Sequence, residues 1–144
     1  MLTVGEVMTR DPVTVTMDDS LKVIREIFEE SRFHHLLVAK DNKLTGVISD
    51  RDLLKHLSPF IGNVWMERTQ DTNTLNKRAH QIMRRPLLVT SANTSVDEAS
   101  VYLLHKRVTC LPVVEGDYQI EGIVTWRDLL THCTFCKQSH SDAA

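Results

Sequence analysis

The sequence lacks long apolar runs, is poor in cysteine and has no excess of positive charge. No stretch approaches the ~20 apolar residues that a membrane-spanning helix needs, and residues 1–6 lack the pattern of a signal peptide. Three cysteines, an odd number, do not make a disulfide framework. With 17 Lys and Arg against 19 Asp and Glu, the net charge is −2, which gives nucleic-acid binding no electrostatic support. We therefore expect a reduced, cytoplasmic protein with neither a membrane nor a nucleic acid as its partner.

Catalytic chemistry is also poorly represented. No nucleophile, base and orienting residue can be grouped from the sequence, so we expect no enzyme. Cys133 and Cys136, flanked by His132 and His140, have the two-residue spacing of a metal-binding knuckle. There is no second such pair, and the surrounding tail is polar, so a frayed C-terminus is the simpler interpretation. A metal or redox role of this cysteine pair is kept as an alternative.

One seven-residue stretch is present twice, as GVISDRD at 46–52 and as GIVTWRD at 122–128, each followed by Leu-Leu. The β-branched pair after the glycine predicts the end of a buried strand, and the Asp-Leu-Leu that follows predicts a helix. The hydroxyl and the Arg-Asp pair then lie where a strand leads into a helix, a position that favours anions. A hydroxyl can hydrogen-bond a phosphate oxygen, and a carboxylate can accept from two ribose hydroxyls.

These two motifs belong to a longer internal repeat. An offset of 74 to 76 residues aligns Met8 with Met83, Pro12 with Pro86 and Gly46 with Gly122. We divide the chain into a first repeat (1–58), a linker (59–78), a second repeat (79–133) and a C-terminal tail (134–144). Phe60 and Trp65 in the linker are apolar, and they pack either on the chain itself or on a second protein.

Both repeats predict the same order of elements. In the first, a capping box at Thr3 opens a short helical turn, and strands follow at 13–16, 35–39 and 44–49. Helices begin after Ser20 and at 50–57. The second repeat predicts a turn at 80–83, strands at 87–90, 111–114 and 120–125, and helices after Ser95 and at 126–133. Each repeat is thus β-α-β-β-α and too small to hold a core alone. We expect an α+β fold in which the two repeats pack with pseudo-two-fold symmetry into one globular module.

The paired Gly-apolar-apolar-Ser/Thr-x-x-Asp motifs and their spacing resemble a tandem CBS-domain pair, often called a Bateman module. The resemblance runs from about Val4 to Cys133. It implies a stand-alone, non-catalytic sensor that binds AMP, ADP or ATP in clefts between the repeats and transmits a conformational change to an unknown protein partner. S-adenosylmethionine, NAD or a cyclic dinucleotide are also possible ligands, no tightly held cofactor is expected, and the family tends to form homodimers through its helices.

The resemblance also implies roles for individual residues. Asp52 and Asp128 match the carboxylate that holds ribose hydroxyls, Ser49 and Thr125 match the hydroxyl that meets a phosphate, and Arg51 and Arg127 are placed to help with that phosphate. The strands that enclose the base supply the remaining candidates, which are Thr14, Val15, His35, Leu36, Leu88, Val89, Cys110, Leu111 and Pro112. The first repeat departs from the family pattern at Leu37, where the second repeat has Pro112.

A purely structural interpretation of the motifs is open beside the functional one. The glycines could serve close backbone approach, Ser49 could cap a helix, and the aspartates could complement the helix dipole. The chain would then be a dimerisation module with degenerate clefts. If the clefts do bind ligands, residues 49–52 sum to −1 and residues 125–128 to 0, because Asp50 stands where Trp126 stands. This difference predicts tighter binding of phosphate-bearing ligands at Thr125–Asp128.

Overall fold

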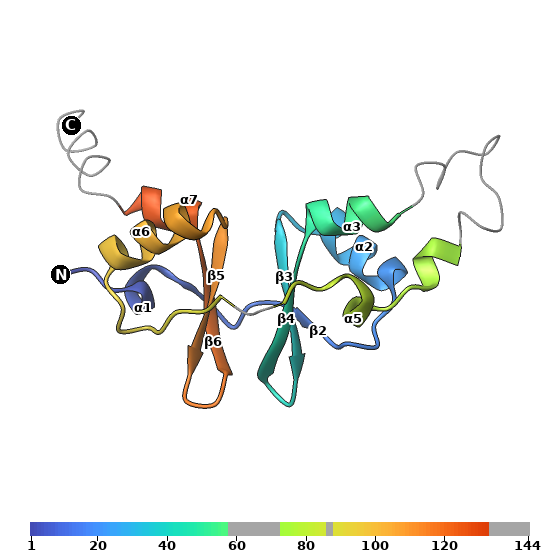
Figure 1. The fold of residues 1–144 in the computed structure, drawn as a ribbon, viewed down its shortest axis with the longest axis horizontal. Coiled ribbons are helices and arrows are strands. Elements are labelled where there is room, and N and C mark those ends of the chain that lie inside the picture. Colours follow the sequence, from blue (N-terminus) through green and yellow to red (C-terminus); the bar gives the residue numbers. More distant parts are fainter. Residues whose placement is uncertain (58–72, 86–87, 133–144) are drawn as a thin grey trace. The chain divides into compact units, whose positions relative to one another are not determined.

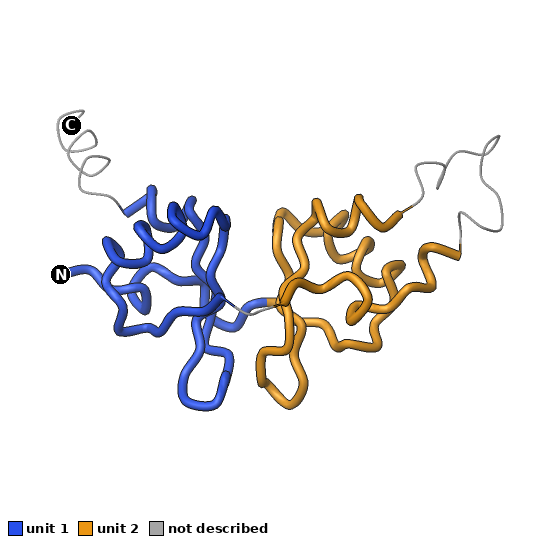
Figure 2. Tube along the Cα trace, viewed as in Figure 1, with its two compact units in different colours: residues 1–12, 88–144 blue, residues 13–87 orange. Residues whose placement is uncertain are grey.

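The computed structural model describes residues 1–57, 73–85 and 88–132. The chain forms two compact units that divide it differently from the sequence repeats (Figure 2). Unit 1 consists of Met1–Pro12 and Leu88–Ala144, and unit 2 consists of Val13–Leu87. Among the described residues, no helix is both long enough and apolar enough to span a membrane.

Unit 2 has the predicted β-α-β-β-α order. Its elements are β2 (Thr14–Val15), α2 (Leu21–Glu30), β3 (His35–Lys40), β4 (Lys43–Ser49) and α3 (Asp50–His56), followed by the 3₁₀ turn η1 (Thr74–Asn76) and α5 (Ala79–Ile82) (Figure 1). β2 pairs in parallel with β3, and β3 pairs antiparallel with β4. The tight turn between β3 and β4 places Asp41 and Asn42 at φ values of 51° and 62°. Aspartate and asparagine tolerate this left-handed conformation better than most residues, so both suit the turn.

The core of unit 2 lies between its sheet and its helices. Ser20 caps α2 by accepting a hydrogen bond from the backbone N–H of Val23, and this helix buries Leu21 and Ile24. Its buried apolar residues are Val15, Leu21, Ile24, Leu36, Val38, Ile48, Leu53, Ala79 and Ile82. Alternate residues of β4 contribute to burial, as expected of a strand with one face toward a core.

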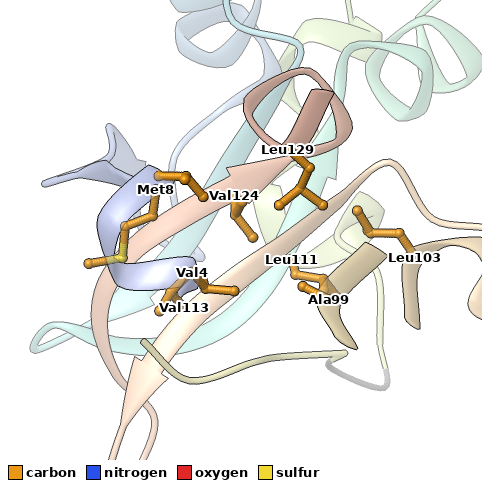
Figure 3. Close-up of a cluster of buried hydrophobic side chains, with 9 residues drawn as sticks. Val4, Met8, Ala99, Leu103, Leu111, Val113, Val124 and Leu129 are labelled. Atoms are coloured by element: carbon orange, nitrogen blue, oxygen red, sulfur yellow. The ribbon is translucent and has the colours of Figure 1, made fainter. Parts of the chain in front are cut away.

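Unit 1 repeats this arrangement with a second hairpin. Its elements are α1 (Val4–Val7), β1 (Thr9–Arg10), α6 (Val96–Lys106), β5 (Cys110–Glu115), β6 (Gln119–Thr125) and α7 (Trp126–Thr131). Figure 3 shows side chains from α1, α6, α7 and both hairpin strands meeting in one apolar cluster. Its buried members are Val4, Val7, Met8, Ala99, Leu103, Leu111, Val113, Val124 and Leu129.

Two short elements differ from the sequence-based expectation. The strand expected at 87–90 is present only as an isolated parallel bridge between Thr90 and Val113 in the described part of this segment. Conversely, the structure has a two-residue strand, β1, that pairs antiparallel with β6 and was not predicted. Both elements depend on pairing with residues far along the chain, for which two or three residues of local sequence give little signal.

The short helix that begins each repeat lies in the unit formed by the other repeat. We call α1 and α5 the leading helices. In unit 1, the N–H groups of Val4 and Gly5 donate to the carbonyls of Thr94 (2.8 Å) and Ala92 (2.9 Å). In unit 2, the N–H of Ala79 donates to the carbonyl of Asp19 (2.8 Å). Each leading helix therefore completes the core of a unit whose other elements come from a different part of the sequence.

The repeated glycines let the chain cross the hairpins closely after each leading helix. A Cβ at Gly46 would lie 2.5 Å from Met83 Sδ, and a Cβ at Gly122 would lie 2.5 Å from the carbonyl oxygen of Thr9. Such distances are too short for a side chain at either position. The structural interpretation of these glycines, close backbone approach, is confirmed at Gly122, whose nearest neighbour is a backbone oxygen, whereas the neighbour of Gly46 is the Met83 side chain.

Candidate ligand-binding site

The Ser49–Asp52 motif forms a reciprocal cap at the start of α3. The backbone N–H of Asp52 donates to Ser49 Oγ (3.0 Å), and the backbone N–H of Ser49 donates to Asp52 Oδ2 (3.0 Å). This is a capping box, in which each side chain satisfies a backbone N–H of the other residue. The cap holds the Asp52 side chain in a buried position, with 9% of it exposed.

Arg84 completes this site from the segment that follows α5. Its Nε–H donates to both carboxylate oxygens of Asp52, at 3.0 Å to Oδ1 and 2.9 Å to Oδ2. The Arg84 backbone is fixed by a 2.8 Å hydrogen bond from its N–H to the carbonyl of Val47, one residue beyond the Gly46 crossing. Burial raises the pKa of Asp52, but the hydrogen bonds from Arg84 and Ser49 outweigh it and hold that pKa below its ordinary value. Sequence reasoning missed Arg84, although its place directly after Met83 in the repeat was visible.

The Thr125–Asp128 motif forms the same cap at the start of α7. The backbone N–H of Thr125 donates to Asp128 Oδ2 (2.9 Å), the Thr125 hydroxyl donates to the same oxygen (3.1 Å), and the Asp128 N–H donates to Thr125 Oγ1 (3.3 Å). All these bonds to the carboxylate use Oδ2. Within residues 1–57, 73–85 and 88–132, Asp128 Oδ1 receives no hydrogen bond.

The two motifs differ most at the residue that follows the leading helix and pairs with the last strand of the hairpin, β6 or β4. In unit 1 this residue is Thr9, which pairs with Ile123 in β6. In unit 2 it is Arg84, which bridges to Val47 in β4. Thr9 and Arg84 directly follow the repeated Met8 and Met83, so they are equivalent positions of the repeat. Among the residues that the structure describes, an arginine therefore contacts the carboxylate of the Asp52 motif and none contacts that of the Asp128 motif.

Strand register brings one further predicted residue beside each motif. His35 lies opposite Ser49, and Cys110 lies opposite Thr125. His35 is half-buried, and this burial lowers the pKa of its imidazole despite the nearby Asp50 carboxylate, so the ring is neutral at pH 7. Cys110 is buried and forms no disulfide within the described residues.

The remaining predicted residues fall into two groups. The side chains of Val15, Leu36 and Leu111 lie in the apolar cores, so a ligand would meet their backbone groups rather than their side chains. Pro112 is buried as well. The others are accessible, with Thr14, Arg51 and Arg127 exposed and Leu88 and Val89 partly buried. Cys133 and Cys136 lie outside the described residues, as do Phe60 and Trp65.

Asp50 and Trp126 occupy the first helical position of α3 and α7 respectively. The Asp50 carboxylate lies 2.9 Å from His34 Nδ1 in an exposed pair, whereas half of Trp126 is exposed. No cluster of three or more His, Cys, Asp or Glu suited to a metal ion is present in the parts of the chain that the structure describes.

Comparison with known proteins places both motifs in one family. The CBS domain profile matches residues 4–59 and 79–134. Curated relatives include the uncharacterized protein MJ1225 of Methanocaldococcus jannaschii, which is 24% identical over 133 residues, covering 90% of this chain and 46% of the relative. Inosine-5'-monophosphate dehydrogenase of Bifidobacterium longum is 30% identical over 125 residues, covering 85% of this chain and 21% of the enzyme. This chain therefore spans less than half the length of these relatives.

Solved structures share the fold over nearly the whole chain. CBSX2, in complex with AMP, is 28% identical with a TM-score of 0.78, covering 95% of this chain and 99% of that one. The CBS domain pair of protein MJ0100, in complex with 5'-methylthioadenosine and S-adenosyl-L-methionine, is 21% identical with a TM-score of 0.76, covering 96% of this chain and 98% of that one. The fold is thus α+β, as predicted, and the chain belongs to the CBS domain family as a tandem pair of CBS domains.

Proposed function

We propose that the chain is a non-catalytic regulatory module that binds an adenosine-containing ligand, AMP, ADP or ATP, at its Ser49–Asp52 and Thr125–Asp128 motifs. The observation that carries this proposal is the duplication of one arrangement. In both units, a hydroxyl residue and an aspartate form a capping box at the start of a helix. The hydroxyl residue also lies opposite a residue of the neighbouring strand at the end of the hairpin. The AMP complex of CBSX2, 28% identical, supports an adenine nucleotide as the ligand.

The chemistry assigned to each motif follows from its donors and acceptors. An aspartate carboxylate accepts hydrogen bonds from the two hydroxyls of a ribose, and this is the role that we propose for Asp52 and Asp128. The hydroxyl of Ser49 and the exposed guanidinium groups of Arg51 and Arg127 supply donors for a phosphate. The Thr125 hydroxyl becomes such a donor once it gives up its hydrogen bond to Asp128 Oδ2. Backbone groups of β3 and β5 and of the segments at Thr14 and Leu88 border the base.

Regulation requires that the ligand binds one conformation more tightly than another. A ligand shifts an equilibrium only by its differential affinity for the two states, so we propose that adenosine binding stabilises one of two arrangements that a protein partner distinguishes. A cytoplasmic location and a homodimeric state belong to this proposal. A reduced compartment suits the buried thiol of Cys110.

A ligand screen by native mass spectrometry and thermal unfolding tests the proposal. The panel contains AMP, ADP, ATP, S-adenosylmethionine, NADH and cyclic dinucleotides, with the matching guanosine compounds as controls. At a ligand concentration 100 times the dissociation constant, binding adds about 2.7 kcal/mol to the free energy of unfolding. This corresponds to a rise in Tm of about 5–10 °C for a chain of this size.

Variants of the two aspartates test whether the ligand binds at the two motifs. The double variant Asp52→Ala and Asp128→Ala should lose the shift caused by the adenosine ligand. A panel in which no adenosine compound raises Tm above its guanosine counterpart would refute the proposal and leave a purely structural dimerisation module as the better account.

A further inference from the structure

The two carboxylate oxygens of Asp52, and likewise those of Asp128, differ in their hydrogen bonds. In both motifs Oδ2 belongs to the cap, because it accepts the backbone N–H of Ser49 or Thr125. Oδ1 takes no part in the cap. In the Asp128 motif it receives no hydrogen bond from the described residues, whereas in the Asp52 motif it receives Nε–H of Arg84 at 3.0 Å. A ribose hydroxyl that approaches Asp52 must therefore share or displace Arg84.

Displacement by an uncharged nucleoside is unfavourable. The ribose would replace an ion pair, in which both partners are charged, with hydrogen bonds from uncharged hydroxyls to the Asp52 carboxylate. The guanidinium of Arg84 would then be left without this buried counter-charge. A nucleotide offers compensation, because its phosphate lies next to the ribose and accepts hydrogen bonds from a guanidinium in the same planar geometry as a carboxylate does. Arg84 is 55% exposed, so it stands at the rim from which it can turn to such a phosphate.

Arg84 also changes the charge comparison between the two motifs. Residues 49–52 sum to −1, and adding Arg84 gives −1 + 1 = 0. Residues 125–128 sum to 0, and Thr9 leaves that sum unchanged. The sequence-based argument for weaker phosphate binding at the first motif therefore no longer holds on charge alone. What separates the motifs instead is a cation on one carboxylate.

We infer that Arg84 is a specificity-determining residue: it makes the Asp52 motif select adenosine ligands that carry a phosphate beside the ribose, while the Asp128 motif, with Thr9 at the equivalent position, also admits the uncharged nucleoside. This inference rests on the proposed function and deepens it. It predicts two unequal sites in one chain. The Asp52 site binds the nucleotide in preference to the nucleoside, and the Asp128 site binds both.

Calorimetric titration of AMP and adenosine tests the inference. The background is the Asp128→Ala variant of the full chain, in which the Asp52 motif alone is intact. Replacing Arg84 by Gln should weaken AMP binding about tenfold and leave adenosine binding equal or stronger, so the AMP preference falls about tenfold. Arg84→Lys, which keeps the charge without the planar fork, should retain part of that preference.

The reciprocal variant guards against a folding artefact. Thr9 is exposed on β1, so Thr9→Arg places the cation at the other motif with little disturbance of the core. In an Asp52→Ala background it should raise the preference for AMP over adenosine at the Asp128 motif. Because a merely structural effect would change both ligands alike, the ratio of the two affinities is the decisive measurement.

The outcomes separate the two proposals. Arg84→Gln shifting AMP and adenosine equally, or leaving AMP unchanged, would overturn the role of Arg84 while adenosine binding stands. An unmodified chain that binds neither compound would overturn the proposed function and the inference together.

Discussion

Gly46 and Gly122 are equivalent residues of the repeat, but an added side chain would meet a flexible side chain at Gly46 and a backbone atom at Gly122. The nearest atoms to an added Cβ at Gly46 belong to the Met83 side chain, whose Sδ and Cγ move with a change of rotamer, while its Cβ at 2.9 Å needs only a small shift of the backbone. At Gly122 the nearest atom is the backbone oxygen of Thr9, 2.5 Å away, which can move only with the β1–β6 pairing. A side chain at position 122 is therefore the more costly of the two.

We predict that Gly122→Ala lowers the free energy of unfolding by about 2–3 kcal/mol and Gly46→Ala by about 1–2 kcal/mol. Urea denaturation measures both values. Gly116→Asn is the control, because Gly116 has a φ of 55°, which asparagine tolerates, and no atom within 4 Å of an added Cβ. Equal losses at positions 46 and 122 would contradict the distinction between a mobile side chain and a fixed backbone.

The depressed pKa of Asp52 links the stability of unit 2 to pH. A carboxyl whose folded pKa lies below its unfolded value of 3.8 stabilises the fold above that value, and this contribution is lost as the pH falls through the folded pKa. We predict that Arg84→Gln lowers the free energy of unfolding at pH 7 by about 1–2 kcal/mol, a value reduced by the exposure of Arg84.

Urea denaturation between pH 2 and pH 7 checks this second prediction. The difference between the unmodified chain and Arg84→Gln should be largest above pH 5 and should shrink as the pH falls below 3.8, because Asp52 then becomes protonated in the unfolded chain and, at lower pH, in the folded chain. A difference that stays constant over the whole range would mean that Arg84 stabilises the chain without acting on Asp52.

At the scale of single residues, local sequence was sufficient for the caps but not for Arg84. Ser-x-x-Asp at 49–52 and Thr-x-x-Asp at 125–128 have the spacing of a capping box, so their reciprocal hydrogen bonds follow from four adjacent residues. The ion pair joins residues 32 positions apart across two elements, and no local pattern encodes such a contact. The repeat alignment gave the equivalence of Thr9 and Arg84, but the structure was needed to show what they face.

At the scale of elements, the hairpins and long helices were predicted within a few residues because each has its own periodicity and caps. The helix at Val96–Lys106 begins after Ser95, as predicted, and buries Ala99 and Leu103. β1 was missed because two residues have no periodicity, and their pairing partner Gly122 is more than 100 residues away. The bridge at Thr90 is shorter than the predicted strand for the same reason.

The caps of α3 and α7 give a third prediction. Thr125→Ala removes both the acceptor for the Asp128 N–H and the donor to Asp128 Oδ2, while Thr125→Ser retains both. We expect Thr125→Ala to lower the free energy of unfolding by about 1 kcal/mol and Thr125→Ser to stay within about 0.5 kcal/mol of the unmodified chain. Thermal unfolding followed by circular dichroism makes the comparison, and two equally stable variants would show that the side-chain cap is dispensable.

At the scale of the whole molecule, both units expose apolar residues on their helices. The first leucine of each Asp-Leu-Leu run is buried, but the second is not: Leu54 is 71% exposed and Leu130 is 53% exposed. Leu104 of α6 is 78% exposed in the same unit as Leu130. Isolated exposed leucines are ordinary, but their recurrence at equivalent positions favours the proposed homodimer through these helices.

We predict that Leu104→Glu combined with Leu130→Glu shifts the chain from dimer to monomer in size-exclusion chromatography with light scattering. Tyr118→Asp, at an exposed apolar residue of the β5–β6 turn, is the matched control and should leave the dimer intact. A dimer that survives the double substitution would place the contact elsewhere, and a monomeric unmodified chain would exclude it.

Because each leading helix lies in the unit formed by the other repeat, unit 2 can fold before unit 1 during synthesis. Every element of unit 2 lies between residues 13 and 87, so this unit can close once the ribosome has released that stretch. The N–H of Val4 must instead wait for the carbonyl of Thr94, 94 − 4 = 90 residues later. At about 5–20 residues per second, α1 waits about 5–20 seconds for the segment that supplies this carbonyl. The helix α1 is thus synthesised before unit 2 but is buried only after it, and until then its apolar residues Val4 and Val7 stay exposed.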